Sequence, residues 1–435
     1  MTSEQPTEAY VWVWLPGAAE PVVAGRVEAV ADIINFNYGQ SYLARDDAVP
    51  LYLPELPLER GQIQPLPGLT VAGCIADAAP DAWGQRVILR RIVGEGLGGE
   101  DPSSLNRLTY LLQTGSDRIG ALDFQASPDE YVSREWSSAP LEELLQSAQR
   151  VEEGVPFSPA LDQALLHGSS IGGARPKTIL DDDGPGLIAK FSSTTDRYAV
   201  VKGEYTAMEL AHRVGLSVAA VTLEEVLGKD VLLIKRFDRV QDSTQRRAIV
   251  SALTILELDE MAARYASYEA LAQKIRERFT GAASTLRELF ARLTLNILVG
   301  NNDDHARNHA AFWDGHALTL TPAYDICPQS RAGGETTQAM AIRADGFRLS
   351  QLAACVRQAS TYLISEAEAR EIIDCQIDVI ESEWNEVCDR ARMTEVERHY
   401  FWRRQFLNPY AFEGYRQSAP QSFASKQDND RPPVV

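Results

Sequence analysis

The pattern of hydrophobic residues changes near residue 245, and this change limits the possible folds more than any other feature of the sequence. Before it, short apolar or β-branched runs such as Tyr10–Trp14 and Leu187–Phe191 predict strands. After it, Leu286–Ile297 and Ile373–Val387 carry apolar residues every three or four positions, which predicts amphipathic helices. Gly300 is suited to end the first of these helices. Strands that come first and helices that follow predict an α+β protein.

The length and composition indicate a folded protein of several lobes. The chain has 435 residues, of which 45% are hydrophobic and 24% charged, as in an ordinary soluble globular protein. At about 150 residues per domain, this length suggests two or three domains. Five cysteines, none of them in a CxxC pair, argue against a disulfide framework or a thiolate zinc site and fit a reducing compartment.

Charge and hydropathy narrow the classes of partner. The 61 acidic and 42 basic residues give a net charge of −19, which suits a basic protein surface better than DNA, although it also serves solubility alone. The first ten residues lack the regions of a secretory signal, and no apolar run is long enough to span a bilayer. We therefore expect a cytoplasmic protein without membrane contact.

The segment Asn301–His309 is the strongest functional motif. It follows the predicted end of a helix and holds more hydrogen-bonding side chains than packing alone requires. Asp303 and Asn308 are five residues apart, and Asp325 follows a short predicted strand. An Asp-x4-Asn loop followed by a strand-borne Asp is typical of protein kinases. There, one carboxylate orients the attacking hydroxyl group, and the amide and second carboxylate hold Mg²⁺.

Two other interpretations of this segment remain open. Asp and Asn side chains in a loop often do no more than cap turns. Alternatively, Asp303, Asp304, His305 and His309 could hold the metal ion of a hydrolase. That hydrolase interpretation leaves the lysine and glycine motifs described next without a role.

Lys190 lies within an apolar strand pattern, where a buried ammonium group needs an anionic partner. Kinases place such a lysine against the phosphates of ATP and pair it with a glutamate on the next helix. Glu204 is the expected partner and Glu209 the second choice. An outward-facing lysine on the strand is the simpler alternative.

Two further segments occupy the positions that a kinase would require. Ser169–Lys177 contains adjacent glycines and two basic residues, which suit a phosphate-covering loop, although its spacing is neither Walker A nor GxGxxG. Taken by itself, it is an ordinary glycine-rich turn. Leu233–Arg239 lies where strands give way to helices. A two-lobed kinase binds adenine through its backbone at that junction.

Taken in order, these motifs resemble those of the HipA family, the kinase toxins of bacterial toxin–antitoxin modules. The matching segments are spread over most of the chain. They are Pro80–Gly84, Asp117–Leu122, Ser170–Lys177, Ile188–Phe191, Gly203–Tyr205, Leu210–Ala211, Lys235–Arg239, Asn301–His309 and Pro322–Ile326.

The resemblance implies a two-lobed, protein-kinase-like fold with a mixed α/β N-terminal part and a mostly helical C-terminal lobe. We expect an α/β subdomain over residues 1–125 and a kinase N-lobe over 126–240. A helical C-lobe over 241–417 and a disordered tail over 418–435 would follow. His-Arg-Asp and Asp-Phe-Gly motifs are absent, as they are in the family, so the chain differs from eukaryotic-type kinases.

The resemblance also implies a role for each site residue. Asp303 would be the catalytic base, and Asn308 and Asp325 would hold Mg²⁺. Ser170 would be the autophosphorylation site, with Ser169 as the alternative, and its phosphate would pull the loop away from ATP. ATP would contact Gly172, Gly173, Ala174, Arg175, Pro176, Lys177, Lys190, Lys235, Arg236, Phe237, His305, Asn308, Tyr324 and Asp325.

The implied activity is ATP-dependent phosphorylation of serine or threonine on a protein concerned with translation, such as an aminoacyl-tRNA synthetase. The implied partner is a helix-turn-helix antitoxin, through which the chain would meet DNA only indirectly. The alternative function is that of a nucleotide-binding regulatory protein without transfer activity.

Overall fold

The computed structural model describes residues 5–93, 105–134, 140–153, 175–180, 186–193, 195–241, 243–331 and 334–415. Its contacts divide the chain into two compact units. The first comprises Met1–Thr195, Glu224–Asp259 and Ala311–Leu318, and the second comprises Asp196–Leu223, Glu260–Ala310 and Thr319–Val435. The domain boundaries at residues 125 and 240 stay a prediction.

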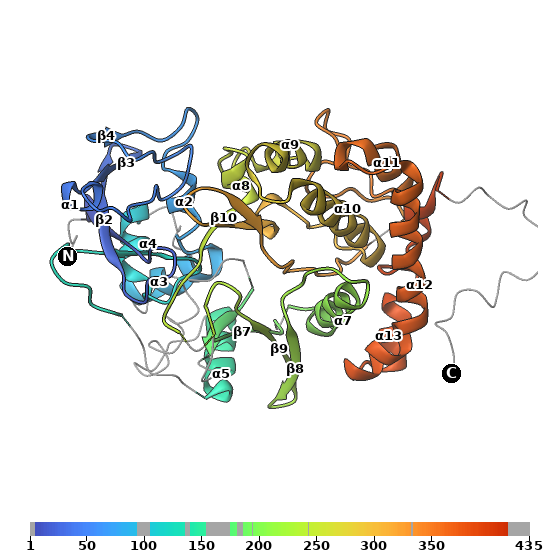
Figure 1. Cartoon of the computed structure of the whole chain (residues 1–435). Coiled ribbons are helices and arrows are strands. Elements are labelled where there is room, and N and C mark those ends of the chain that lie inside the picture. Colours follow the sequence, from blue (N-terminus) through green and yellow to red (C-terminus); the bar gives the residue numbers. More distant parts are fainter. Residues whose placement is uncertain are drawn as a thin grey trace, which may run out of the picture. The chain divides into compact units, whose positions relative to one another are not determined.

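The first unit begins with an antiparallel sheet of five strands in the order β4-β3-β2-β1-β5 (Figure 1). The strand predicted around Tyr10–Trp14 is β1, whose register shifts by a bulge between Val11 and Trp12. The strands are β1 (Glu8–Val13), β2 (Val22–Val30), β3 (Ile33–Tyr38), β4 (Gln62–Ile63) and β5 (Leu122–Gln125).

A second sheet in the order β6-β7-β9-β8 carries the strand with Lys190, as the sequence predicts. Its strands are β6 (Lys177–Leu180), β7 (Leu187–Phe191), β8 (Val221–Val226) and β9 (Lys229–Lys235). Buried Trp83, Phe191 and Val231 join this sheet to three helices in one apolar core. Those helices are α3 (Ala82–Val93), α4 (Arg107–Gln113) and α5 (Leu141–Glu153).

A small third sheet and several short helices complete the strand-rich part of the chain. The sheet has the order β10-β11-β12, with β10 (Ala248–Ser251), β11 (Ala310–Trp313) and β12 (Leu318–Leu320). The short helices are α1 (Gln40–Leu43), α2 (Gly73–Ala76) and α8 (Ala252–Ile255).

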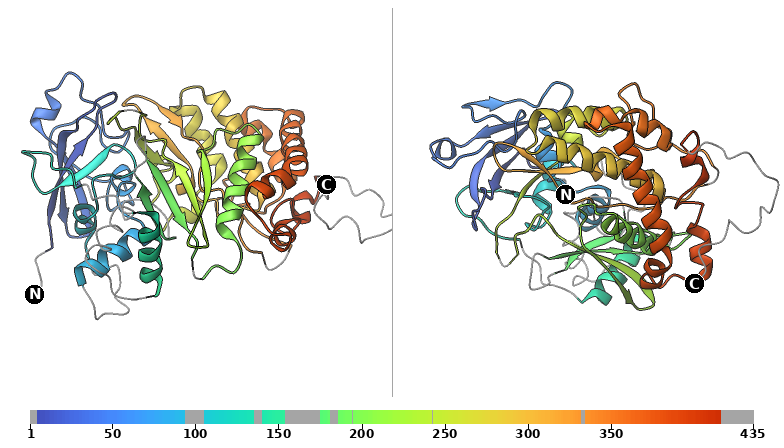
Figure 2. Two further views of the ribbon diagram at one scale, coloured as in Figure 1. Left: turned by 90° about the horizontal axis from the view of Figure 1, so that it is seen from below. Right: turned by 45° about the vertical axis from the view of Figure 1, so that its right-hand side comes forward.

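The second unit is built mainly from helices, and α12 packs against both α7 and α10 (Figures 1 and 2). Its α-helices are α7 (Val200–Arg213), α9 (Tyr268–Arg278), α10 (Ala282–Val299), α11 (Leu352–Arg357), α12 (Glu366–Arg390) and α13 (Glu395–Phe401). Short 3-10 turns are η2 (Ala263–Tyr265), η3 (Ala306–Asn308), η4 (Ala359–Tyr362) and η5 (Pro409–Phe412). In the part of the chain that the structure describes, no helix has both the length and the apolar character needed to cross a membrane.

Helix α10 positions the loop that follows it. The predicted stripe from Leu286 to Ile297 is buried, which confirms that this face packs into the core. The helix ends at Gly300, whose φ is +72°. A Cβ atom there would lie 2.7 Å from the backbone oxygen of Gln405, so only glycine fits both the left-handed backbone and the close approach. The polar loop therefore starts from a fixed point.

A buried glutamate closes the N-terminus of α2 in the first unit. The Glu55 carboxylate accepts hydrogen bonds from the backbone N–H groups of Gly73, at 2.7 Å, and Cys74, at 2.9 Å. Desolvation nevertheless raises the pKa of Glu55 to about 7, because the two hydrogen bonds offset only part of the cost of burying the charge. Glu55 therefore titrates near neutral pH.

This burial predicts a dependence of stability on pH. Because the pKa of Glu55 is higher in the folded than in the unfolded chain, its contribution to stability is full below the unfolded value and is lost as the pH rises through about 7. Glu55→Gln, which mimics the protonated group, should reduce the stability difference between about pH 5 and about pH 8 by about 3 kcal/mol. Urea unfolding at both pH values measures it.

The exposed Glu59 provides the control, since Glu59→Gln should leave the pH dependence unchanged. Identical pH dependence in the wild type and Glu55→Gln would contradict the shifted pKa.

Candidate functional site

The loop after α10 is fixed by hydrogen bonds to buried amide groups. The backbone N–H of Asn301 donates to the Asn296 carbonyl at 2.8 Å, and its side chain donates to the Asn296 side chain at 3.0 Å. The Gln338 side chain donates to the Asn301 carbonyl at 2.9 Å. The N–H groups of Ala339 and Met340 donate to the carbonyls of Asn302, at 2.9 Å, and Asp304, at 3.2 Å. The backbone on both sides of Asp303 is therefore held in place.

Asp303 lies exposed on this anchored loop, and two other predicted site residues lie near it. Partial desolvation raises the pKa of Asp303, and the nearby charge of Asp325 raises it further, whereas His305 lowers it. The Asn308 side-chain N–H donates to the Asp303 carbonyl at 3.4 Å. The structure thus brings Asp303, His305, Asn308 and Asp325 together within the second unit.

Asp325 has an uncommon backbone conformation. Its φ is +58°, in the left-handed region that non-glycine residues rarely adopt and that Asp tolerates better than most. The segment before it is pinned, because Ala323 donates to the Ser217 carbonyl at 2.8 Å and Ala219 donates to the Ala323 carbonyl at 2.9 Å. Strained residues of this kind cluster at functional sites.

Tyr324 links the segment that carries Asp325 to the loop that carries Asn308. Its hydroxyl group donates to the carbonyl of Arg307 at 2.7 Å, so the residue before Asp325 is tied to the 3-10 turn that carries Asn308. The sequence analysis assigned Tyr324 to ATP binding. The structure shows in addition that its hydroxyl group joins the two halves of the site.

Arg292 is a supporting residue that the sequence analysis missed. It is buried on α10, and its guanidinium group donates to the carbonyls of Thr321 at 2.8 Å and Ser217 at 3.2 Å. The Glu288 carboxylate pairs with it at 3.0 Å. A single arginine within an apolar helical stripe is the signal that could have indicated it, because a buried guanidinium group must find acceptors.

Asp304 and His309 form a buried pair behind the loop. Their side chains approach to 3.0 Å, and both line a small pocket together with Asn308. Asp303 in contrast is exposed, and among the described residues no group of three or more His, Cys, Asp or Glu side chains could hold a metal ion. This geometry does not support the hydrolase interpretation, in which Asp303, Asp304, His305 and His309 share one ion.

The first unit holds the other predicted ATP-binding residues that the structure describes. Lys177 is directly opposite Lys190 in the antiparallel pairing of β6 and β7, so both side chains lie on one face. Lys177 is buried and Lys190 is half-buried. Two lysines on one face of a sheet suit the binding of phosphate oxygens. Arg175 and Pro176 directly precede β6.

The structure describes the three predicted hinge residues but not most of the predicted glycine-rich loop. Lys235 is exposed, Arg236 is buried, and half-buried Phe237 packs edge-on against Phe312 with ring centres 6.0 Å apart. Ser169, Ser170, Gly172, Gly173 and Ala174 lie outside the described residues.

Glu204 is buried on α7 in the second unit, and its pairing with Lys190 stays a prediction. The second-choice partner, Glu209, instead pairs with Arg390 at 3.2 Å.

Comparison with models of protein families identifies the family of the chain. Residues 13–125 match the HipA N-terminal domain, and residues 169–384 match the HipA-like C-terminal domain. The chain belongs to the HipA family. The resemblance that the sequence motifs indicate is thereby confirmed, and so is the kinase-like α+β fold.

The chain is also similar to individual proteins and solved structures. "Putative kinase Y4mE" of Sinorhizobium fredii (strain NBRC 101917 / NGR234) is 24% identical over 324 residues, which cover 67% of this chain and 71% of that protein. HipA in the Shewanella oneidensis MR-1 complex of HipA, HipB and operator DNA has a TM-score of 0.65 and 19% identity, covering 90% of this chain and 94% of that one. The Helicobacter pylori kinase CtkA gives a TM-score of 0.36 and 15% identity, over 51% of this chain and 90% of that one.

The donors at this HipA-family site fit a magnesium ion. Asn308 offers an amide oxygen and Asp325 a carboxylate, which are the hard oxygen ligands that Mg²⁺ prefers. The repulsion between the Asp303 and Asp325 carboxylates is a second indication, because a bound cation would offset it. The residues present are therefore suited to such an ion.

The link made by Tyr324 can be tested by stability. Tyr324→Phe removes the hydroxyl group that donates to the Arg307 carbonyl, so the free energy of unfolding should fall by about 1 kcal/mol. Tyr265 is 71% exposed, and Tyr265→Phe should leave the stability unchanged. Equal stability of Tyr324→Phe and the wild type in urea unfolding would show that the bond contributes nothing.

Proposed function

We propose that this HipA-family chain is an ATP- and Mg²⁺-dependent serine/threonine protein kinase that acts as the toxin of a toxin–antitoxin module. The observation that carries the proposal is the convergence of Asp303, Asn308 and Asp325 within the second unit. Two carboxylates, one of them exposed, and one amide are the groups that phosphoryl transfer requires. The kinase-like fold and the kinase name of the Sinorhizobium relative support it.

In the proposed reaction, Asp303 orients the attacking hydroxyl group of the substrate and accepts its proton. Its raised pKa makes Asp303 a better proton acceptor than an ordinary Asp. Asn308 and Asp325 would hold the magnesium ion, which neutralises charge on the phosphates when it is bound. Lys177 and Lys190 would bind phosphate oxygens from one face of their sheet.

The kinase proposal predicts that the purified chain labels itself with γ-labelled ATP and Mg²⁺. Asp303→Asn keeps the shape of the side chain but removes the base, so the rate of labelling should fall at least about a hundredfold. Asp378 is an exposed Asp on α12, and Asp378→Asn should label like the wild type. Full labelling of Asp303→Asn would refute its catalytic role.

The same experiment tests the alternative function. A chain that binds ATP but transfers no phosphate, to itself or to a cell extract, would be a nucleotide-binding regulator and not a kinase.

Ser170 is the proposed site of autophosphorylation, and its segment lies outside the described residues. Ser170→Ala should therefore lose most of the label while its affinity for ATP stays the same. Ser169→Ala is the matched control and should keep the label. Mass spectrometry of the phosphopeptide decides between the two, and phosphate on Ser169 would move the proposed site by one residue.

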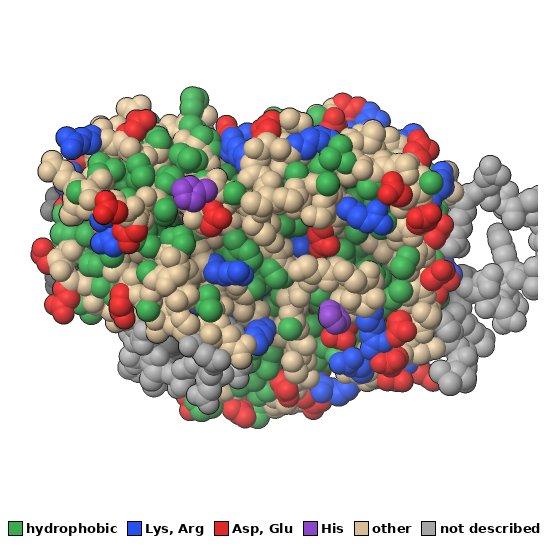
Figure 3. Space-filling view, in the orientation of Figure 1, with side chains coloured by type: hydrophobic (Ala, Val, Ile, Leu, Met, Phe, Trp, Pro, Cys, Tyr) green, Lys and Arg blue, Asp and Glu red, His purple; other side chains and the backbone are tan. Residues whose placement is uncertain are grey.

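We also propose a basic helix-turn-helix antitoxin as partner and a translation-related protein as substrate. The structural relative from Shewanella oneidensis is a complex with HipB and operator DNA, and the net charge of −19 suits a basic protein. On the face drawn in Figure 3, acidic and basic side chains are interspersed. The substrate, for which an aminoacyl-tRNA synthetase is the first candidate, is sought by comparing phosphoproteomes of cells with the wild type and with Asp303→Asn. The cytoplasmic location stays a prediction.

A further inference from the structure

In the first unit, the loop Asp117–Gly120 binds the segment Arg236–Arg239 through ion pairs and hydrogen bonds. The Asp117 carboxylate pairs with Arg236 at 2.8 Å and with Arg239 at 2.6 Å. The backbone carbonyl of Arg118 accepts hydrogen bonds from the same two guanidinium groups, at 2.9 Å and 2.5 Å. The loop thus offers a carboxylate and a carbonyl to two arginines that lie about 120 residues later in the sequence.

Asp238 closes the cluster from the other side. Its carboxylate accepts hydrogen bonds from Arg236 at 2.9 and 2.8 Å and from Arg239 at 2.7 Å. It also accepts one from the backbone N–H of Gly120 at 2.9 Å. The carboxylates of Asp117 and Asp238 thus face the guanidinium groups of Arg236 and Arg239, with the charge of Arg246 close by. Arg236 and Asp238 are almost fully buried, and burial of such charges is tolerated only where they are paired.

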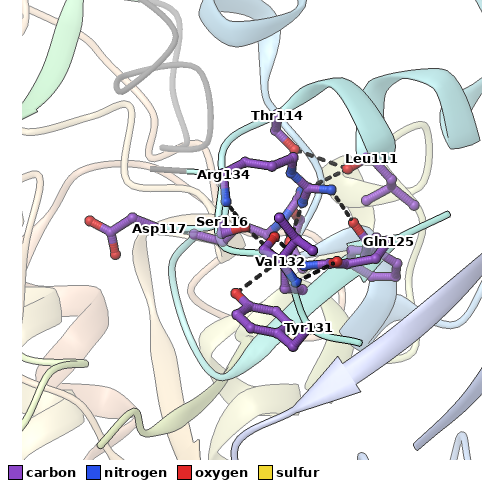
Figure 4. A network of polar contacts seen from close by, with 12 residues as sticks. Leu111, Thr114, Ser116, Asp117, Gln125, Tyr131, Val132 and Arg134 are labelled. Atoms are coloured by element: carbon purple, nitrogen blue, oxygen red, sulfur yellow. Dashed lines mark hydrogen bonds and ion pairs between the residues drawn. The ribbon is translucent and has the colours of Figure 1, made fainter. Parts of the chain in front are cut away.

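Further contacts fix the loop Asp117–Gly120 itself. The side chain of Arg118 enters a second buried cluster, where it pairs with Asp123 at 2.9 Å, and Arg134 pairs with the same carboxylate at 2.6 Å. Figure 4 shows Asp117 pointing away from the cluster of Ser116, Tyr131 and Arg134. Gly120 has a φ of +81°, and a Cβ atom there would lie 3.4 Å from the backbone nitrogen of Ile249. The loop is therefore a fixed base for the arginines it holds.

The segment Arg236–Arg239 overlaps the proposed adenine-binding hinge, Lys235–Phe237. The Arg236 side chain is engaged in the cluster, and its backbone N–H donates to the Gly186 carbonyl at 3.1 Å, so the residue is held at both its side chain and its backbone. Phe237 follows at once and is half-buried. A hinge that binds adenine through backbone groups requires an exact backbone position, and a small displacement has a large effect on binding.

We propose that Asp117 is a positioning residue for nucleotide binding, which holds the hinge backbone through Arg236 and Arg239. This inference rests on the proposed kinase function and extends it. Asp117 belongs to the segment that matches the HipA N-terminal domain, and the arginines belong to the segment that matches the C-terminal domain. The N-terminal domain is then part of the nucleotide site without touching the nucleotide.

The test uses the full chain and three probes: ATP, adenosine and tripolyphosphate. Asp117→Asn removes the charge of a half-buried side chain and keeps its shape, so the fold should survive. We expect about tenfold weaker binding of ATP and of adenosine, and unchanged binding of tripolyphosphate, because only the adenine contacts the hinge. Isothermal titration calorimetry measures all three.

Matched variants separate positioning from general destabilisation. Asp117→Glu keeps the carboxylate and should restore most of the affinity for adenosine. Arg239→Gln removes the ion pair with Asp117 from the arginine side and should reproduce the loss of affinity for adenosine. Glu55→Gln alters a buried carboxylate elsewhere in the first unit and should leave the binding of all three probes unchanged.

Each other outcome has a definite meaning. If Asp117→Asn binds adenosine like the wild type, or loses adenosine and tripolyphosphate equally, the positioning role is refuted and the kinase proposal stands. If the wild type binds neither ATP nor adenosine, the kinase proposal and this inference both fail.

Discussion

The proximity of Asp303 and Asp325 is the constraint on which the proposed site depends. Partial desolvation raises the pKa of Asp303, and the nearby charge of Asp325 raises it further, so the chain must hold the two carboxylates together by other interactions. It does so through the backbone. Hydrogen bonds of Asn301 and its neighbours fix the loop, and the pinned segment before Asp325 holds that residue in a left-handed conformation. A bound cation would offset the repulsion between these two carboxylates.

The supports of this arrangement come from distant parts of the second unit. Gly300 gives the loop its starting point at the end of α10, Gln338 holds its first carbonyl, and Tyr324 joins its turn to Asp325. Arg292 donates to the carbonyl of buried Thr321 and also to that of Ser217. The first unit uses a comparable device, in which buried arginines and carboxylates fix the backbone around Arg236. In both places buried polar groups define a geometry, and removing one partner would leave the other unpaired.

Much of the fold could be predicted from periodicity alone. The stripe along α10, the strand around Lys190 and the end of the helix at Gly300 follow from local pattern, because side-chain burial repeats with the period of each element. The supports of the site could not be predicted in this way. Arg292 and Tyr324 act on backbone carbonyls, and any residue has a carbonyl, so the sequence holds no sign of which one they reach.

Ion pairs between residues far apart in the sequence could not be predicted from local pattern either. Charge alone does not distinguish Asp117, which pairs with Arg236 across the fold, from other acidic residues of the chain. The sequence analysis did find the three groups of the candidate site, because Asp303, Asn308 and Asp325 have a characteristic spacing. Their roles remain predictions until a ligand is bound.

A crystal structure of the chain with Mg²⁺ and a non-hydrolysable ATP analogue tests the central claim most directly. The account predicts that oxygen atoms of Asn308 and Asp325 coordinate the ion and that Asp303 faces the terminal phosphate. A metal ion bound elsewhere, or a terminal phosphate remote from these three residues, would contradict it.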